Sequence, residues 1–138
     1  MPGKQVVAAI ALIHDSEGKI FLQKRNDLSI PEAHGKWEFP GGGIEFGETG
    51  EEAVMRECRE EMGCEVIVER FIPIFWTSMW KKENGEKFQA FVVCYQCRIA
   101  TGMPRPSNQE VSQIGWFTKD EIRQMETLPG THAVIAHA

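Results

Sequence analysis

The chain has 138 residues, of which 42% are hydrophobic and 25% charged, the balance of an ordinary globular protein. No apolar run approaches the roughly 18 residues that a membrane helix needs, and no basic stripe of the kind that binds nucleic-acid phosphates is present. We therefore expect one domain over residues 1–138, located in the cytoplasm, that spans no membrane and binds no nucleic acid.

The beginning of the chain is expected to fold as strands joined by loops. The start of the chain has one lysine and a short apolar run but no convincing small-residue cleavage site, and VVAAIALIH continues smoothly into a turn, so a buried strand is favoured over a signal peptide. KIFLQKR alternates as a second strand. The next segments are read as a polar loop, a short extended piece and a glycine-rich loop, over residues 26–35, 36–40 and 41–48.

A helix is expected over residues 49–62. Thr49 and Glu52 have the spacing of a capping box, and Gly63 is the type of residue that ends a helix. The apolar residues of this segment fall on one helical face, which predicts docking against a sheet. They are Val54, Met55, Cys58 and Met62.

The second half of the chain again favours strands. CEVIVERFIPIFW is strand-rich but contains Pro73, which indicates an edge strand or a bend. Asn84-Gly85 predicts a hairpin turn, and KFQAFVVCYQC, apolar on both faces, predicts a central strand. A loop over residues 101–109, a short strand over 114–117 and a helix over 118–125 follow, and the tail is weakly helical at best. This arrangement predicts an α+β fold.

The chain contains four cysteines: Cys58, Cys64, Cys94 and Cys97. Cys94 and Cys97 form a CxxC, a spacing that can indicate metal or redox chemistry. Here the pair lies within a predicted strand, where residues three apart point to opposite faces. We therefore expect all four to be small buried hydrophobes.

Acidic residues concentrate in residues 42–64. This segment holds seven acidic and two basic residues, so the whole net charge of −5 falls within it. On a helical wheel Glu57, Glu60 and Glu61 lie in one narrow arc, with Arg56 beside them. Such crowding costs a helix about 0.2–0.5 kcal/mol for each like-charged pair. An acidic helix face alone is usually only solvated, but the adjacent glycine-rich loop favours a hard-cation site for Mg²⁺ or Mn²⁺.

Residues 42–64 resemble the Nudix box, G-x5-E-x7-R-E-U-x-E-E-x-G-U, where U is a bulky aliphatic residue. Every glycine and charged position of the pattern matches, and Cys58 and Cys64 occupy the two U positions. The resemblance implies the Nudix fold, an α/β/α sandwich around a mixed β-sheet, with the box as a loop–helix–loop. It also implies metal-dependent hydrolysis of a nucleoside diphosphate linked to another group X.

The same resemblance implies roles for individual residues. The ligands of Mg²⁺ or Mn²⁺ would be the side chains of Glu57, Glu60 and Glu61 and the main-chain carbonyl of Gly41. Arg56 would orient these glutamates for catalysis. Gly42 and Glu48 would support the ligands from behind.

The general base stays open among three carboxylates. In such a hydrolysis, metal ions neutralise the phosphate oxygens and acidify a water, and a carboxylate within hydrogen-bond reach removes the proton. Glu57 and Glu60 are candidates within the box. Glu110, in the loop before the IGWF strand, is the third.

The substrate is only partly constrained. WEFPGG and EFGET resemble the MutT-like branch, which converts (d)NTPs to monophosphates and pyrophosphate. Residues 79–82 lack the downstream proline and tyrosine that mark ADP-ribose and dinucleoside polyphosphate hydrolases, although those substrates and nucleotide sugars stay as the alternative. Candidate substrate contacts are His34, Trp37 and Trp80, since aromatic rings stack on bases.

Two functions of other classes fit the sequence less well. A binding module that uses the fold without catalysis would be expected to have lost box glutamates, and this chain keeps them all. An isoprenoid diphosphate isomerase would need a reactive cysteine before the box, and the first cysteine is Cys58. A small nucleotide is therefore the expected partner, and a homodimer is compatible with the sequence but not required by it.

Overall fold

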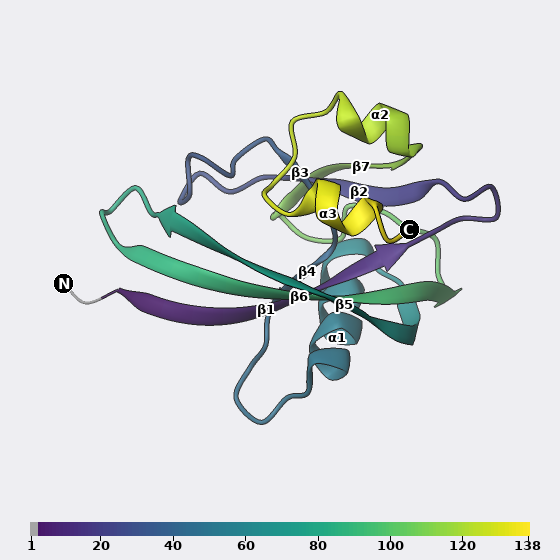
Figure 1. The fold of residues 1–138 in the computed structure, drawn as a ribbon, viewed down its shortest axis with the longest axis horizontal. Helices are drawn as coiled ribbons and strands as arrows, with labels where there is room; N and C mark the ends of the chain where they lie inside the picture. The colour runs from purple at the N-terminus through teal and green to yellow at the C-terminus, as the bar shows by residue number, and fades with distance from the viewer. Residues whose placement is uncertain (1–2) are drawn as a thin grey trace.

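The computed structural model describes residues 3–138, so the first two positions of the predicted domain lie outside it. Its elements alternate strands with three helices, and Figure 1 shows them in colour from the N-terminus to the C-terminus. In chain order they are β1 (Lys4–Ile13), β2 (Ile20–Arg25), β3 (Trp37–Glu38), β4 (Gly41–Gly43), α1 (Gly50–Met62), β5 (Glu65–Lys81), β6 (Lys87–Thr101), β7 (Val111–Phe117), α2 (Lys119–Arg123) and α3 (Thr131–Ile135). No helix in the described part of the chain is long and apolar enough to cross a membrane.

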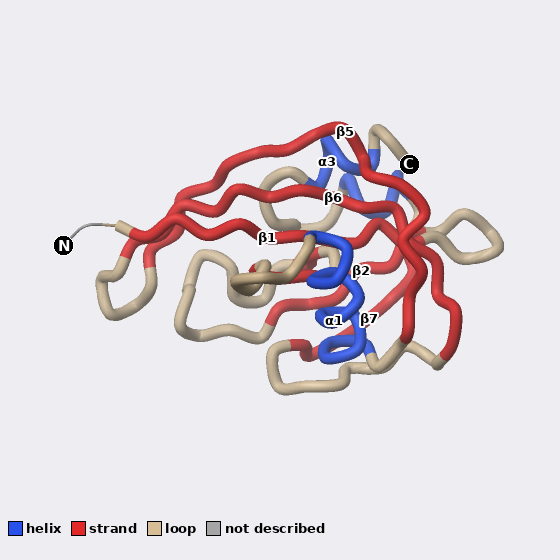
Figure 2. The backbone as a smooth tube through the Cα atoms, turned by 90° about the horizontal axis from the view of Figure 1, so that it is seen from below, coloured by secondary structure: helices blue, strands red, loops and turns tan. Residues whose placement is uncertain are grey.

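The strands form two sheets. The four-stranded sheet has the order β4-β1-β6-β5, and it is mixed because β1 and β6 run parallel while the other pairs are antiparallel. The three-stranded sheet has the order β3-β2-β7. Helix α1 lies on one side of the strands, and α2 and α3 lie on the other (Figures 1 and 2). The predicted α/β/α arrangement around a mixed sheet is confirmed.

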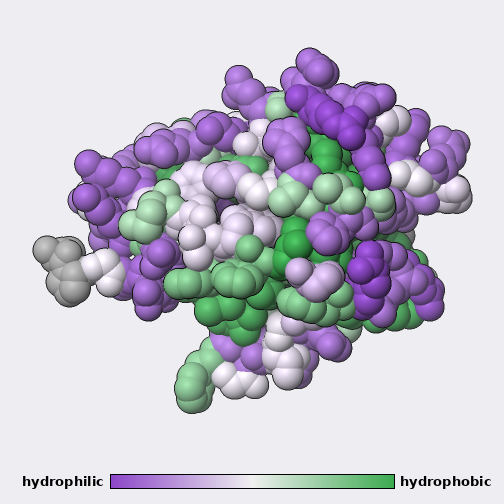
Figure 3. All heavy atoms as spheres, viewed as in Figure 1, coloured by the Kyte–Doolittle hydropathy of each residue, from purple (hydrophilic) through white to green (hydrophobic). Residues whose placement is uncertain are grey.

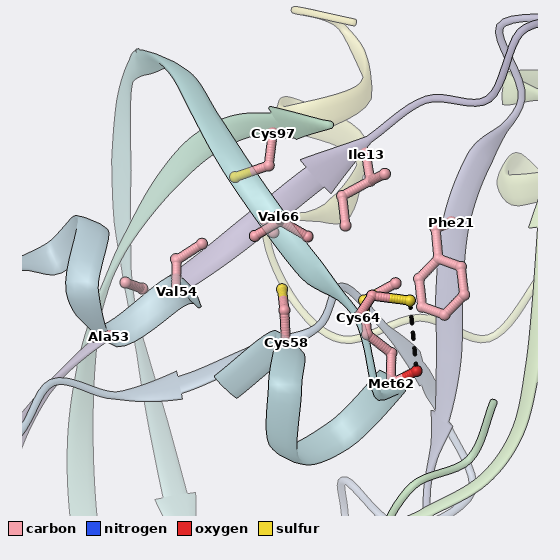
Figure 4. Close-up of a cluster of buried hydrophobic side chains, with 11 residues drawn as sticks. Ile13, Phe21, Ala53, Val54, Cys58, Met62, Cys64, Val66 and Cys97 are labelled. Carbon is pink, nitrogen blue, oxygen red and sulfur yellow. Dashed lines mark hydrogen bonds between the residues drawn. The ribbon is translucent and has the colours of Figure 1, made fainter. Parts of the chain in front are cut away.

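Strand β1 separates two hydrophobic clusters because its side chains alternate between two faces. Ala9, Ala11 and Ile13 face α1, where they pack with its buried residues. Leu12 belongs to the second cluster, together with residues of α2 and α3. Figure 4 shows the first cluster, with Cys58 pointing from α1 toward the sheet. A helix docked in this way has its position along the sheet fixed by packing.

The cysteines behave as predicted. Cys58, Cys64 and Cys97 lie in the cluster under α1, whereas Cys94 lies in the opposite cluster. All four are buried and free, and burial raises the pKa of the Cys94 and Cys97 thiols to about 12. Thiols held protonated in this way are poor nucleophiles and poor metal ligands.

Two details of the strands bear on the earlier predictions. Strand β5 is an edge strand with an irregular register between Ile72 and Phe75, which confirms the reading of Pro73. The predicted glycine-rich loop is wrong in its first part, because Gly41–Gly43 forms strand β4 beside Ala8–Ile10 of β1. Gly41 has a φ of 151°, and a Cβ there would collide with the backbone of β1. Only glycine permits this close approach.

Candidate active site

Helix α1 is fixed at both ends by its own sequence. The Thr49 side chain accepts a hydrogen bond from the Glu52 N–H, and the Glu52 side chain accepts one from the Thr49 N–H. At the other end Gly63 adopts a left-handed conformation with a φ of 72°. Since the apolar face of the helix is held in the first cluster, its glutamates are directed toward β4.

Arg56 organises the glutamates around it. Its Nε donates to Glu48 Oε2 at 2.7 Å, and its Nη1 donates to Glu57 Oε1 at 2.9 Å and to Glu60 Oε2 at 3.3 Å. Its Nη2 donates to the carbonyl of Gly43 at 3.0 Å. The hydrogen bonds from Arg56 hold the pKa of Glu48 at about 2. The arginine thus ties helix α1 to the loop that precedes it.

Glu61 is the most deeply placed carboxylate of the helix. Only 4% of the residue is exposed, and its Oε1 accepts a hydrogen bond of 2.8 Å from the Gly41 N–H. Burial, and then the negative charge of Glu38, raise the pKa of Glu61 well above its ordinary value. A buried carboxylate in this state is destabilised when it ionises, because a nearby positive charge is what it lacks.

Glu57 lies between Arg56 and β4. Burial raises its pKa despite the hydrogen bond from Arg56, and the charges of Glu60 and Glu110 add to the rise. A Cβ on Gly42 would come within 2.6 Å of Glu57 Oε1. The glycine therefore leaves the space that this carboxylate occupies.

The carboxylates fit a divalent cation by chemistry rather than by present geometry. As the side chains stand in residues 3–138, no three acidic, histidine or cysteine groups converge as metal ligands. Arg56 turns Glu57 and Glu60 toward itself, and the Gly41 N–H holds Glu61. Burial, and after it the charges of neighbouring carboxylates, nevertheless raise the pKa of both Glu57 and Glu61. A cation would relieve that repulsion, and oxygen ligands are those that Mg²⁺ and Mn²⁺ prefer.

A second polar group, which the sequence did not indicate, lies beside the first. Arg25 Nη1 donates to Glu38 Oε1 at 3.1 Å, and its Nη2 donates to Asp27 Oδ2 at 2.7 Å. Gln23 Nε2 donates to Glu38 Oε2 at 3.2 Å. Burial raises the pKa of Glu38, while Arg25 Nε and Gln23 Oε1 are buried without a partner among the described residues. The sequence held one sign of this buried group: Glu38 stands between two aromatic residues, Trp37 and Phe39, in a short extended segment.

A cavity of about 220 Å³ opens next to these polar groups. It lies on the side of the four-stranded sheet opposite α1, because its lining includes Ala8 and Ile10, which alternate with the β1 residues packed against α1, and Thr131 of α3. Its floor is formed by alternate residues of three neighbouring strands, and its far end by Arg25, Glu38 and Gly41–Gly43. The floor residues are Val6, Ala8 and Ile10 of β1, Phe88, Ala90 and Val92 of β6, and Trp76, Ser78 and Trp80 of β5. In the view of Figure 1, Figure 3 shows apolar side chains gathered in the middle of the molecule, with hydrophilic ones around them.

The three residues predicted to contact the substrate lie in different surroundings. Trp80 lines the cavity. Trp37 packs edge-on against Phe117, with ring centroids 5.1 Å apart, and His34 is exposed and accepts a hydrogen bond from the Asp27 N–H. Neither of these two is among the residues that line the cavity.

Glu110 is exposed and directly precedes β7. Its charge raises the pKa of both Glu57 and Glu38, although it is a smaller cause than burial for each. The loop before β7 therefore adds a further carboxylate near Glu57, Glu60 and Glu61 of helix α1, which together we call the acidic group.

Comparisons with known proteins agree with this geometry. The chain is 28% identical over 123 residues to a MutT-like protein of Streptomyces ambofaciens, covering 89% of this chain and 70% of that protein. It is 44% identical over 62 residues to the 8-oxo-dGTP diphosphatase of Escherichia coli K12, covering 44% of this chain and 45% of that protein. The crystal structure of a MutT NUDIX hydrolase from Burkholderia pseudomallei matches with a TM-score of 0.62 and 31% identity, over 96% of this chain and 95% of that one. The family profile of the NUDIX domain matches residues 4–137, and the chain therefore belongs to the Nudix hydrolase family.

Proposed function

We propose that this chain hydrolyses nucleoside or deoxynucleoside triphosphates to monophosphates and pyrophosphate, with Mg²⁺ or Mn²⁺ as cofactor. One observation carries the proposal: strand β4, which lines one end of the apolar cavity, also contacts the glutamates of helix α1 and their arginine. Gly41–Gly43 line the cavity, and the same strand contacts Glu61 through the Gly41 N–H and Arg56 through the Gly43 carbonyl. A base and a phosphate chain could therefore be held side by side.

The two curated relatives support this choice of substrate. One carries the name of a MutT-like protein, and the other is named 8-oxo-dGTP diphosphatase. The latter similarity extends over less than half of each chain, namely 44% and 45%. It therefore supports the triphosphate class more than any single base.

In the proposed reaction the carboxylates of Glu57, Glu60 and Glu61 and the Gly41 carbonyl hold the cation. When bound, that ion supplies charge neutralisation at the phosphates and a more acidic water. Arg56 would orient Glu57 and Glu60 through the hydrogen bonds described above. Glu48 holds the arginine in turn, and Gly42 leaves room for Glu57.

We assign proton removal to Glu110. Its exposed carboxylate lies close enough to Glu57 to raise that residue's pKa, and it is not held by Arg56 as Glu57 and Glu60 are. A general base must be free to reach the attacking water and to lose its proton to solvent afterwards. An exposed loop residue meets that requirement better than a side chain fixed by an arginine.

The test is phosphorus NMR of the protein with Mg²⁺ and a panel of substrates. The panel holds the common (d)NTPs, 8-oxo-dGTP, ADP-ribose, a nucleotide sugar and a dinucleoside tetraphosphate. We expect pyrophosphate and a monophosphate from the triphosphates. Inorganic phosphate with a diphosphate, or turnover restricted to the other compounds, would contradict the proposal and move the chain to the alternative substrates.

A further inference from the structure

The floor of the cavity presents side chains to a base but hardly any hydrogen-bonding groups. We propose that this chain holds the nucleotide base by stacking and shape alone, so that bases of different hydrogen-bonding pattern are used with comparable efficiency. The inference rests on the proposed function and adds to it the mode of recognition: the site accepts bases broadly instead of reading one base edge.

The backbone of the floor cannot read a base. Strands β1 and β6 pair over ten residues, and β6 also pairs with β5 through the Trp76–Val92, Ser78–Ala90 and Trp80–Phe88 pairs. The N–H and C=O groups of these ladders are paired with neighbouring strands except along the outer edge of β5, and all of them lie in the plane of the sheet instead of pointing into the cavity. What the floor presents to the cavity is therefore its side chains, and these are aromatic or aliphatic except for Ser78.

Most polar side-chain atoms along the cavity are already engaged, the exception being Arg25 Nε, which is buried without a partner among the described residues. The polar side chains among the described residues that line it are Arg25, Glu38, Ser78 and Thr131. Arg25 and Glu38 bind each other at the end nearest the glutamates. The Thr131 hydroxyl donates to the Leu128 carbonyl at 2.7 Å. The Ser78 hydroxyl accepts from Trp80 Nε1 at 3.0 Å, which leaves it one freely rotating proton.

The wall opposite the floor offers little more. Leu128 uses its N–H on the Trp37 carbonyl and its own carbonyl on Thr131. Pro129 has no N–H, and the Gly130 carbonyl accepts from the Val134 N–H at the start of α3. The Ser78 hydroxyl can donate to an acceptor on any base, so it confers no choice between them.

The aromatic side chains, by contrast, are arranged in advance. The hydrogen bond to Ser78 fixes the Trp80 indole, and Trp80 lies directly opposite Phe88 in the β5–β6 ladder. Stacking on aromatic rings tolerates any base because every base has a π-face. Apolar pockets discriminate by about 10–200-fold, whereas sites that hydrogen-bond their substrate reach roughly 10⁴–10⁵-fold. The structure therefore assigns this cavity to the first class.

The experiment compares kcat/KM for ATP, GTP, CTP and UTP and for the four dNTPs, each with Mg²⁺. Within either sugar series we expect the best and worst bases to differ by less than about 200-fold, and a wider spread overturns the inference. Dissociation constants of the same nucleotides, measured in EDTA by quenching of tryptophan fluorescence, should show the same narrow range. If no triphosphate is hydrolysed, the proposed function fails, while these constants still decide the mode of recognition; absence of binding by every nucleotide overturns it.

A pair of matched variants tests whether nucleotide binding depends on the aromatic side chains of the cavity. Trp80→Ala should raise the dissociation constant by about 10-fold or more for every base alike, with circular dichroism unchanged. Phe75→Ala is the control, because Phe75 lies on the same strand but is 70% exposed and lines no part of the cavity; it should change binding by less than about twofold. A Trp80→Ala effect no larger than that of the control, or a Ser78→Ala variant that loses only one base, contradicts recognition by stacking.

Discussion

The proposed site has two ends that are built in opposite ways: an acidic end, formed by the glutamates of helix α1 and strand β4, and an apolar end, formed by the cavity. The acidic end comes from one stretch, Gly41–Glu61, and its side chains are crowded, hydrogen-bonded and shifted in pKa. The apolar end comes from three strands and two loops far apart in the chain, and its side chains carry almost no charge. The difference indicates where stability is given up for chemistry. Buried like charges destabilise the acidic end of the metal-free protein. The apolar end carries no such cost, because its floor consists of apolar side chains of the sheet itself.

The largest effect should come from neutralising the acidic end alone. Glu61→Gln keeps the shape of the side chain and an oxygen that can accept from the Gly41 N–H, but it removes a metal-binding charge. We expect kcat to fall by roughly 1000-fold or more, since a bound metal supplies several kcal/mol of transition-state stabilisation. Nucleotide affinity measured in EDTA should stay within about threefold if the two ends are independent. Steady-state kinetics and fluorescence titration provide the two readings.

The control is Glu65→Gln, which removes the same charge from an exposed pair with Arg59 outside the proposed site. It should leave kcat unchanged. An equal loss in both variants, or a Glu61→Gln rate close to that of the wild type, would remove Glu61 from the metal site.

The same substitution should stabilise the metal-free protein. Burial raises the pKa of Glu61, so the folded state binds its proton more tightly than the unfolded state does. The stability contributed by this group is therefore present below the unfolded pKa and is lost as pH rises through the folded pKa. At pH 7 without metal we expect Glu61→Gln to raise the free energy of unfolding by about 1 kcal/mol, measured by urea denaturation. A less stable variant would mean that the buried Glu61 carboxylate is stabilised in the folded protein by interactions beyond its hydrogen bond with the Gly41 N–H.

The second effect tests whether the acidic end includes the loop before β7. Glu110→Gln should lower kcat by about 100-fold or more, the range for loss of a general base. The affinity for Mn²⁺, followed by electron paramagnetic resonance, should stay the same because Glu110 is not among the proposed ligands. Unchanged turnover would leave Glu57 or Glu60 as the base.

The third effect is expected where the two ends meet. Gly42 lines the cavity, and a Cβ on it would come within 2.6 Å of Glu57 Oε1. We expect Gly42→Ala to displace that carboxylate and lower kcat by about 10–100-fold, since small misplacements at a reacting centre can cost up to about 100-fold. Gly43→Ala is the matched control, because a Cβ there meets nothing within 4 Å. Similar rates in the two variants would show that Glu57 moves aside without consequence.

The acidic end could be predicted because its information is local. The capping residues Thr49 and Gly63, the arc of glutamates and the contacts of Arg56 with Glu57 and Glu60 all follow from spacing along one helix. The burial of Cys94 and Cys97 in opposite clusters likewise followed from strand alternation.

The remainder depends on pairings that spacing does not encode. Strand β4 consists of three glycines, which have no side chains to reveal a pattern. Arg25 and Glu38 meet because β2 pairs with β3, and neither residue signals that partnership by itself. Trp80 was predicted as a substrate contact, but the cavity around it, with Trp76, Ser78 and Phe88, appears only when β5, β6 and β1 lie side by side.

The smallest effect concerns the support behind the acidic end. Hydrogen bonds from Arg56 lower the pKa of Glu48 from an ordinary value of 4.5 to about 2. Because the folded pKa is the lower one, the stabilisation is fully present above pH 4.5 and is lost as pH falls toward 2. Glu48→Gln should therefore melt below the wild type at pH 6, and the gap should narrow between pH 4.5 and pH 3. Glu45→Gln is the control, because its carboxylate is 71% exposed and lies 3.9 Å from Arg56. Differential scanning calorimetry at pH 6, 4.5 and 3 would measure both gaps. A Glu48→Gln gap that does not change with pH would mean that Arg56 holds Glu48 by shape rather than by charge, and that the ionic network of the acidic end stops at Glu57 and Glu60.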